Sequence, residues 1–138
     1  MKEQNYLYIN ELKEDILYMF PFVHPDVAVF IACQSACETA YGRSTIYLEN
    51  NNLFGMKRAR MRLQSAIGLH RDHCVYFDRC QSINDYFLWL AFHAFVQSDF
   101  RSLDSFVSRF PWSVYCPEND GYLASIQSIY KSFKNYSK

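Results

Sequence analysis

The segment from Val27 to Cys37 is apolar on nearly every side of a helix, and it constrains the fold more than any other part of the chain. A helix that is apolar all round belongs in the middle of a domain. The run is too short to cross a membrane, and Gln34 interrupts it. A proline and an acid favour a helix start just before it, and Gly42 favours a stop after it. We therefore predict a central buried helix over residues 24–41.

The remaining segments predict further helices around one irregular stretch. Apolar residues recur at helical spacing, and capping or breaking residues stand at the expected ends. The expected helices cover residues 8–20 up to Pro21, a segment that begins at Ser82 in a variant of the capping box, the stretch from Ser102 to Pro111, and residues 119–135. This pattern predicts a mainly α fold.

Residues 43–81 break the helical pattern and predict a small β element. Three arginines alternate with apolar residues over 58–63, which is strand periodicity. Gly68 suggests a turn and residues 74–77 a returning strand. We expect a two- or three-stranded hairpin that forms a β lobe of about residues 50–80, and hence an α+β fold overall.

Length and composition favour one compact domain over residues 1–138. Half of the residues are hydrophobic and 18% are aromatic, which argues against disorder. Lys and Arg together number 14, as do Asp and Glu, so a uniformly basic nucleic-acid binder is disfavoured. No signal peptide is recognisable at the N-terminus. We expect synthesis in the cytoplasm, no membrane span and no nucleic-acid partner.

The five cysteines form an odd set, which favours reduced thiols over a disulfide framework. A bridge between Cys74 and Cys80 is the one open alternative. His70, His73 and the two cysteines match no closed zinc pattern, so we expect no metal and no cofactor.

Glu38 is an acid near the C-terminal end of the most apolar helix. A carboxylate there opposes the helix dipole, and apolar surroundings also disfavour its charged form, so both effects predict a raised pKa. A carboxylic acid that stays protonated near neutral pH can protonate a glycosidic oxygen. The alternative is an exposed acid, or one that pairs with a nearby arginine.

Two motifs resemble those of the glucosaminidase family of peptidoglycan hydrolases, the glycoside hydrolase family 73 type. They are Gln34–Ser44 (QSACETAYGRS) and Asn51–Lys57 (NNLFGMK), in the family's order and at a plausible distance. Cys37 stands where the family commonly has leucine. Weaker similarity follows at Tyr76–Tyr86 and Tyr115–Tyr122, so the resemblance covers about residues 27–130. It implies a lysozyme-like fold, in which a helical lobe and a small β lobe flank a sugar-binding cleft.

The resemblance also implies roles for individual residues. Glu38 becomes the general acid, and Tyr115 matches a tyrosine that helps at the cleaved bond. Asn51–Gly55 becomes the turn that enters the β lobe, where asparagine side chains hold the backbone or touch sugar. The candidate substrate-binding residues are Tyr41, Ser44, Asn52, Phe54, Lys57 and Tyr122.

A second catalytic group is harder to place, because no glutamate occurs between Glu49 and Glu118. Asp72 or Asp78 could activate a water molecule, or the acetamido group of the substrate could act as the nucleophile. In a third alternative, a hydroxyl group of the sugar itself displaces the leaving group, as in a transglycosylase. The expected activity is an endo-β-N-acetylglucosaminidase that cuts between N-acetylglucosamine and N-acetylmuramic acid.

Other readings of the chain stay open. A lytic transglycosylase or muramidase on the same fold is one alternative, and a non-catalytic cell-wall-binding module is another. The basic run Lys57–Arg62 has three possible roles: it binds the carboxylates of peptidoglycan, it binds nucleic-acid phosphates, or it is a solvent-exposed face with no ligand. The expected partner is the peptidoglycan glycan strand, in the periplasm or outside the cell, and the sequence leaves any immunity or export partner unknown.

Overall fold

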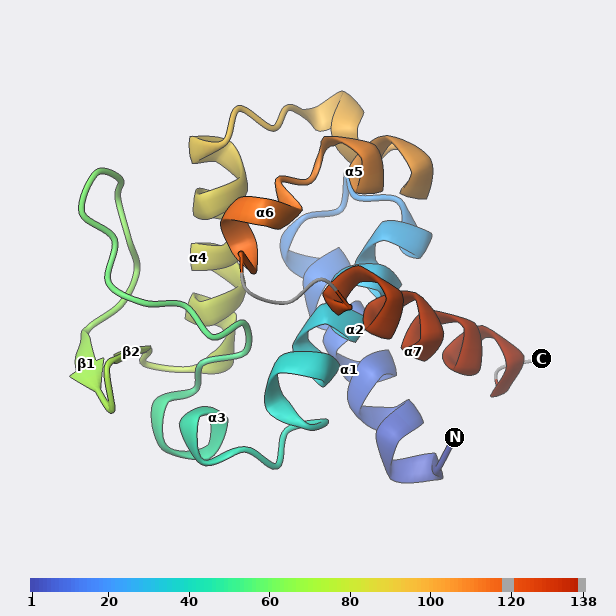
Figure 1. Cartoon of the computed structure of the whole chain (residues 1–138), viewed down its shortest axis with the longest axis horizontal. Coiled ribbons are helices and arrows are strands. Elements are labelled where there is room, and N and C mark those ends of the chain that lie inside the picture. Colours follow the sequence, from blue (N-terminus) through green and yellow to red (C-terminus); the bar gives the residue numbers. More distant parts are fainter. Residues whose placement is uncertain (118–120, 137–138) are drawn as a thin grey trace. The chain divides into compact units, whose positions relative to one another are not determined.

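The computed structural model describes residues 1–117 and 121–136, which form helices and one small sheet (Figure 1). The predicted mainly α class with a small β element is confirmed. The chain forms two compact units, the first made of Met1–Cys37 with Val96–Lys138 and the second of Glu38–Phe95. A single catalytic domain with a lysozyme-like cleft stays a prediction.

The first unit is helical. Its elements are α1 (Glu3–Met19), α2 (Pro25–Thr39, whose last two residues belong to the second unit), η1 (Gln97–Phe100), α5 (Leu103–Arg109), α6 (Trp112–Tyr115) and α7 (Tyr122–Tyr136). Every residue of α2 from Val27 to Ala36 is buried, which confirms the predicted central helix. Ser102 caps α5 by accepting a hydrogen bond from the Ser105 N–H, as predicted.

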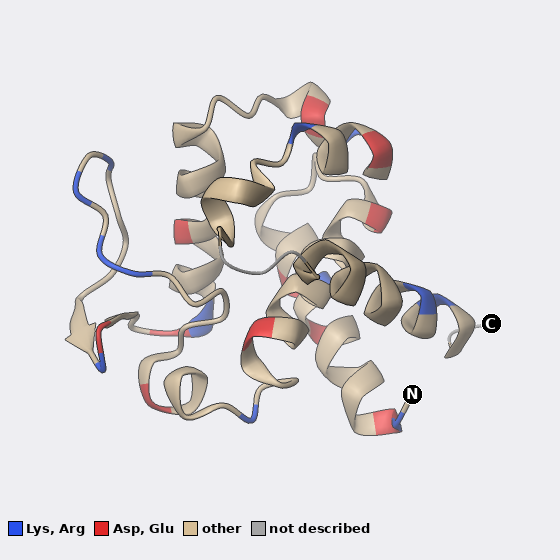
Figure 2. Ribbon diagram, in the orientation of Figure 1, with Lys and Arg blue, Asp and Glu red and all other residues tan. Residues whose placement is uncertain are grey.

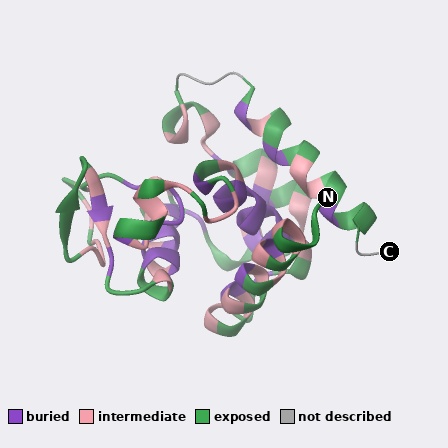
Figure 3. Cartoon of the chain, turned by 90° about the horizontal axis from the view of Figure 1, so that it is seen from below, coloured by how far each residue is buried: buried purple, intermediate pink, exposed green. Residues whose placement is uncertain are grey.

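Aromatic rings fill the core of the first unit. Phe30 of α2 contacts the rings of Phe106, Trp112 and Tyr130, from α5, α6 and α7, at centroid distances of 6.0–6.3 Å. Helix α7 alternates buried and exposed positions along its length, as Figure 3 shows beside the C-terminus. Each apolar stripe thus faces the core while the polar stripe faces solvent.

The second unit contains α3 (Thr45–Asn50), β1 (Gly68–His70), β2 (His73–Val75) and α4 (Arg79–Phe92). The strands pair antiparallel, with Leu69 opposite Cys74. Arg71 and Asp72 form the turn, and both have positive φ, as the type I′ turn of a two-residue hairpin requires. The predicted hairpin therefore exists, but Gly68 begins a strand and does not mark the turn.

Two predictions in this unit are wrong. Residues 58–62 form no strand, because Arg62 turns inward to a buried carboxylate and the segment pairs with no strand among the described residues. Helix α4 begins at Arg79, since Asp78 is its N-cap and accepts a hydrogen bond from Gln81 N–H. Ser82 is buried inside that helix, where its Oγ accepts from Leu53 N–H at 2.9 Å.

Other boundaries shift modestly. Helix α1 begins at Glu3, earlier than predicted, and α2 ends at Thr39. Helix α7 is described from Tyr122, and the first predicted residues of that helix, 119 and 120, lie outside the described residues. The short elements α3, α6 and η1 carry too few residues for a periodic signal.

No helix in the described part of the chain has both the length and the apolar character needed to span a bilayer. All five cysteines are free, so Cys74 and Cys80 are not bridged. Burial raises the pKa of the Cys33 thiol far above its ordinary value, which makes it a poor nucleophile.

Candidate active site

The end of α2 is a tight left-handed turn that presents Glu38. Ala40, Tyr41 and Gly42 all have positive φ, which ends the helix abruptly. Thr39 holds the turn: its Oγ1 accepts from Gly42 N–H at 2.9 Å, and its carbonyl accepts from the N–H groups of Arg43 and Ser44. The chain around Glu38 is therefore fixed by hydrogen bonds on its C-terminal side.

Three consecutive asparagines tie α3 to the hairpin. Asn50 Nδ2 donates to the carbonyl of His70, and Asn51 Nδ2 donates to that of Tyr76. Asn52 is buried, and its amide makes four bonds: Nδ2 donates to two carbonyls, and Oδ1 accepts from two backbone N–H groups. The hydrogen bonds of the Asn52 amide thus stabilise the turn that leads to Gly55.

Gly55 lies directly against the carboxylate of Glu38. A Cβ placed on Gly55 would stand 2.9 Å from Glu38 Oε2 and 3.6 Å from its Cδ. Gly55 also has a φ of +67°, which side-chain-bearing residues rarely adopt. The two halves of the sequence motif, which are separate along the chain, therefore meet in space at the acid.

Glu38 itself is exposed. The prediction that apolar side chains bury it is wrong: the run of buried residues in α2 ends at Ala36, Cys37 is half-buried, and Glu38 lies beyond it at the end of the helix. Glu38 stands at the negative end of the helix dipole, and no basic residue in the last turn of α2 compensates for this.

A buried ion pair shapes the segment between α3 and β1. Asp85, in α4, is fully buried, and Arg62 donates to it at 2.6 Å. Tyr76 Oη and Gln64 Nε2 donate to the same carboxylate. Burial and the Asp85 hydrogen bond both raise the pKa of Tyr76 far above its ordinary value, so the phenol keeps its proton. No sequence pattern predicted this cluster, although the acid directly before the aromatic pair at 86–87 was a signal for it.

The two candidate aspartates have different surroundings. Asp72 is exposed in the hairpin turn and lies 3.8 Å from Lys57 Nζ. Asp78 is exposed too, but its carboxylate caps α4. The carboxylate of Asp72 therefore has fewer structural contacts than that of Asp78.

The other candidates of the second unit have evident structural contacts. Ser44 is the N-cap of α3 and accepts from Tyr47 N–H at 3.2 Å. Phe54 is buried, with its ring 4.2 Å from that of Tyr86. Tyr41 is half-buried, with the Arg43 guanidinium 5.9 Å from its ring centroid. Phe54 is thus enclosed, whereas Tyr41 and Ser44 are half-buried and Ser44 is engaged as a helix cap.

Tyr115 and Tyr122 lie together in the first unit. Their ring centroids are 5.7 Å apart, and Tyr115 also packs against Phe110 at 5.3 Å. Tyr122 is buried while Tyr115 is half-buried. Tyr115 is thus the more accessible of this aromatic pair.

No group of three or more His, Cys, Asp or Glu side chains that could hold a metal occurs within residues 1–117 and 121–136. The carboxyl group of Glu38 can act as an acid. A helix-terminal glutamate against a glycine turn, in a mainly helical fold with a small hairpin, fits the class of glycoside hydrolases, which protonate a glycosidic oxygen with a carboxyl group.

Comparison with protein families agrees with this class. Residues 26–135 match the glucosaminidase family, described as mannosyl-glycoprotein endo-beta-N-acetylglucosaminidase. The match covers most of the chain, including both motif halves, and the chain belongs to this family. Its membership supports a role as a glycoside hydrolase that acts on peptidoglycan. Searches of curated proteins and of solved structures found no match.

Proposed function

We propose that the chain is an endo-β-N-acetylglucosaminidase that cleaves the β-1,4 bond between N-acetylglucosamine and N-acetylmuramic acid, with Glu38 as general acid. The observation that carries this proposal is the close approach of Glu38 Oε2 to Gly55, which joins the two family motifs at one carboxyl group. The proposed place of action is the cell wall, in the periplasm or outside the cell.

In this proposal the substrate completes the acid's environment. A sugar ring over the exposed carboxyl excludes water, and loss of water favours the protonated form. The proton then passes to the leaving-group oxygen as the glycosidic bond breaks and the sugar develops oxocarbenium character. Because Gly55 has no side chain, the carboxyl of Glu38 can lie directly beside its backbone.

The second group is either Asp72 or the acetamido group of the substrate. Asp72 is exposed, so it is free to hold a water molecule, whereas Asp78 is engaged as a helix cap. Water activation by Asp72 gives inversion at the anomeric carbon, and acetamido participation gives retention. Tyr115, half-buried in the first unit, is proposed to assist at the cleaved bond.

Mass spectrometry of the products from purified peptidoglycan tests the proposal. New reducing ends on N-acetylglucosamine are the expected result. New ends on N-acetylmuramic acid indicate a muramidase, and anhydro-muramyl ends indicate a lytic transglycosylase; either contradicts the proposed bond or reaction. Absence of any cleavage indicates a non-catalytic wall-binding module. The anomer formed first, read by NMR, separates Asp72 from acetamido participation.

A further inference from the structure

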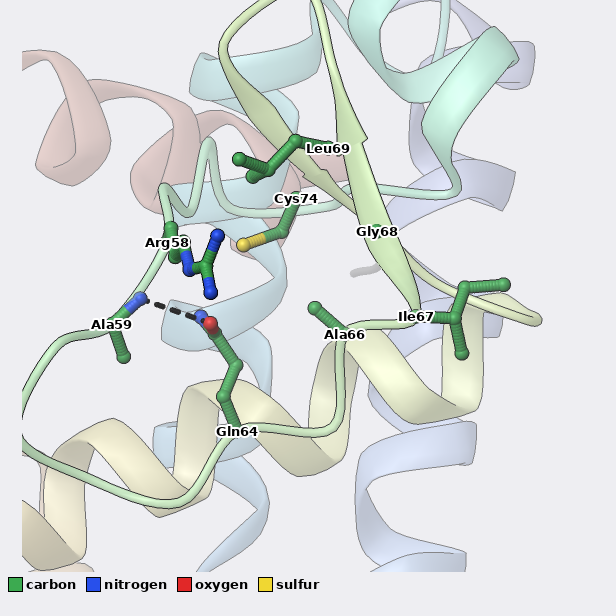
Figure 4. Close-up of a pocket in the computed structure, with 8 residues that line it drawn as sticks. All are labelled: Arg58, Ala59, Gln64, Ala66, Ile67, Gly68, Leu69 and Cys74. Carbon is green, nitrogen blue, oxygen red and sulfur yellow. Dashed lines mark hydrogen bonds between the residues drawn. The ribbon is translucent and has the colours of Figure 1, made fainter.

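A pocket of about 530 Å³ lies in the second unit, beside the hairpin. Arg58 is the charged residue of its lining, and it stands beside the apolar side chains of Ala59, Ala66, Ile67, Leu69 and the buried Cys74, with the Gln64 amide and Gly68 completing the wall. In Figure 4 the Arg58 guanidinium, the Cys74 thiol and the Ala66 methyl group point toward one another, while Ile67 points away. The volume falls in the range of small-ligand sites.

Arg58 is available to an anion. It makes no hydrogen bond or ion pair with any residue in the described part of the chain, whereas Lys57 lies near Asp72 and Arg62 is bound to Asp85. Figure 2 shows that the loop between α3 and β1 carries basic residues and no acidic ones. A guanidinium without an acidic partner, beside the small apolar side chains of Ala66 and Leu69, suits a carboxylate attached to a small apolar group.

The pocket wall is held rigid by hydrogen bonds. Gln64 Oε1 accepts from Ala59 N–H at 2.9 Å, and Gln64 Nε2 donates to the Lys57 carbonyl and to Asp85. The loop thus closes on itself and is anchored to the buried carboxylate in α4. A site preformed in this way needs little ordering when a ligand binds.

We propose that this pocket binds the terminal carboxylate of the peptide stem of peptidoglycan, with Arg58 as the anion-binding residue. This proposal rests on the proposed function for its substrate. Arg58 follows Gly55 by three residues, so their Cα atoms are at most about 11 Å apart. A stem of four residues spans about 13 Å when extended. A stem on a sugar at Glu38 is therefore long enough to reach the pocket, and in this proposal the methyl group of a terminal alanine meets Ala66 and Leu69.

Binding of a synthetic stem tetrapeptide that ends in D-alanine tests the pocket without any need for catalysis. Titration into the full-length protein by calorimetry, with NMR of the Gln64 side-chain amide, compares wild type with Arg58→Gln. The matched control is Arg60→Gln, an exposed arginine of the same loop that does not line the pocket. Loss of one charged hydrogen-bond donor predicts about tenfold weaker binding for Arg58→Gln and unchanged binding for Arg60→Gln.

The C-terminal amide of the same tetrapeptide is the second control. It is expected to bind wild type as weakly as the free acid binds Arg58→Gln. No binding by wild type, equal binding of acid and amide, or equal weakening by both variants overturns the proposal; the last result indicates general attraction by the basic loop. Because the peptide titration does not depend on glycan cleavage, failure of the proposed enzyme activity is read separately from failure of the pocket.

Discussion

Replacing Arg62 by methionine removes the cation from a buried ion pair while keeping much of the side chain's apolar length. The Arg62 side chain is 8% exposed and that of Asp85 is 0% exposed, and their closest atoms are 2.6 Å apart. After the change, Asp85 keeps the Tyr76 and Gln64 donors but loses its only opposite charge within the described residues. A buried carboxylate without a cation is strongly unfavourable.

The expected loss is about 3–5 kcal/mol, the usual cost of removing one partner of a buried pair. At about 2.1 cal/mol/K per residue, the 138-residue chain has an unfolding entropy of roughly 0.29 kcal/mol/K, so Tm falls by about 10–17 °C. Asp85→Asn in the same background removes the orphaned charge and keeps an acceptor for Tyr76. The double variant Arg62→Met/Asp85→Asn is therefore expected to be more stable than Arg62→Met.

Urea unfolding followed by circular dichroism measures these free energies, and a double-mutant cycle isolates the pair. Arg60→Met is the matched control, because Arg60 is exposed two residues away; its expected effect is within about 0.5 kcal/mol. If Arg62→Met costs less than about 1 kcal/mol, the pair behaves like a surface salt bridge and the reasoning fails.

Two further predictions concern the hairpin side of the second unit. Gly55→Ala places a methyl group 2.9 Å from Glu38 Oε2, so the carboxyl must move and we expect roughly a hundredfold loss of peptidoglycan turnover. Because residue 55 has a φ of +67°, the same change is expected to lower the free energy of unfolding by about 1–2 kcal/mol. Full activity of Gly55→Ala would show that the close approach is unimportant. Hydrogen bonds from Arg71 and His70 lower the pKa of Glu49 below its usual 4.5, so its stabilising contribution is complete above that pH and is lost as pH falls through the lowered pKa. Amide exchange in the hairpin is expected to be faster in Glu49→Gln than in wild type near neutral pH. The difference is expected to shrink as the pH falls below 4.5 and through the lowered pKa, and a constant difference would be contrary evidence.

The central helix could be predicted because its signal is local and redundant. Burial of residues 27–36 follows from an unbroken apolar run, whatever packs around it. The cap at Ser102 is similarly local, since its partner is three residues away. Such features depend on neighbours along the chain and are visible in the sequence alone.

The errors arose where distant residues decide the conformation. Residues 58–62 have the alternation of a strand, but Arg62 points inward because its partner Asp85 lies 23 residues later. The meeting of Glu38 with Gly55 was implied only through the family motif, since spacing does not show which face of a turn approaches an acid. The exposure of Glu38 contradicts the prediction from its apolar helix, because burial depends on what covers the helix end.

Turnover of purified peptidoglycan by Glu38→Gln tests the central claim most directly. Glutamine matches the shape of glutamate but has no acidic proton to donate. We expect a loss of roughly 10²- to 10⁴-fold with an unchanged Tm, while Glu11→Gln, a change at an exposed glutamate in α1, keeps wild-type turnover. Equal clearing of peptidoglycan by Glu38→Gln and wild type would contradict the role of Glu38 as the catalytic acid.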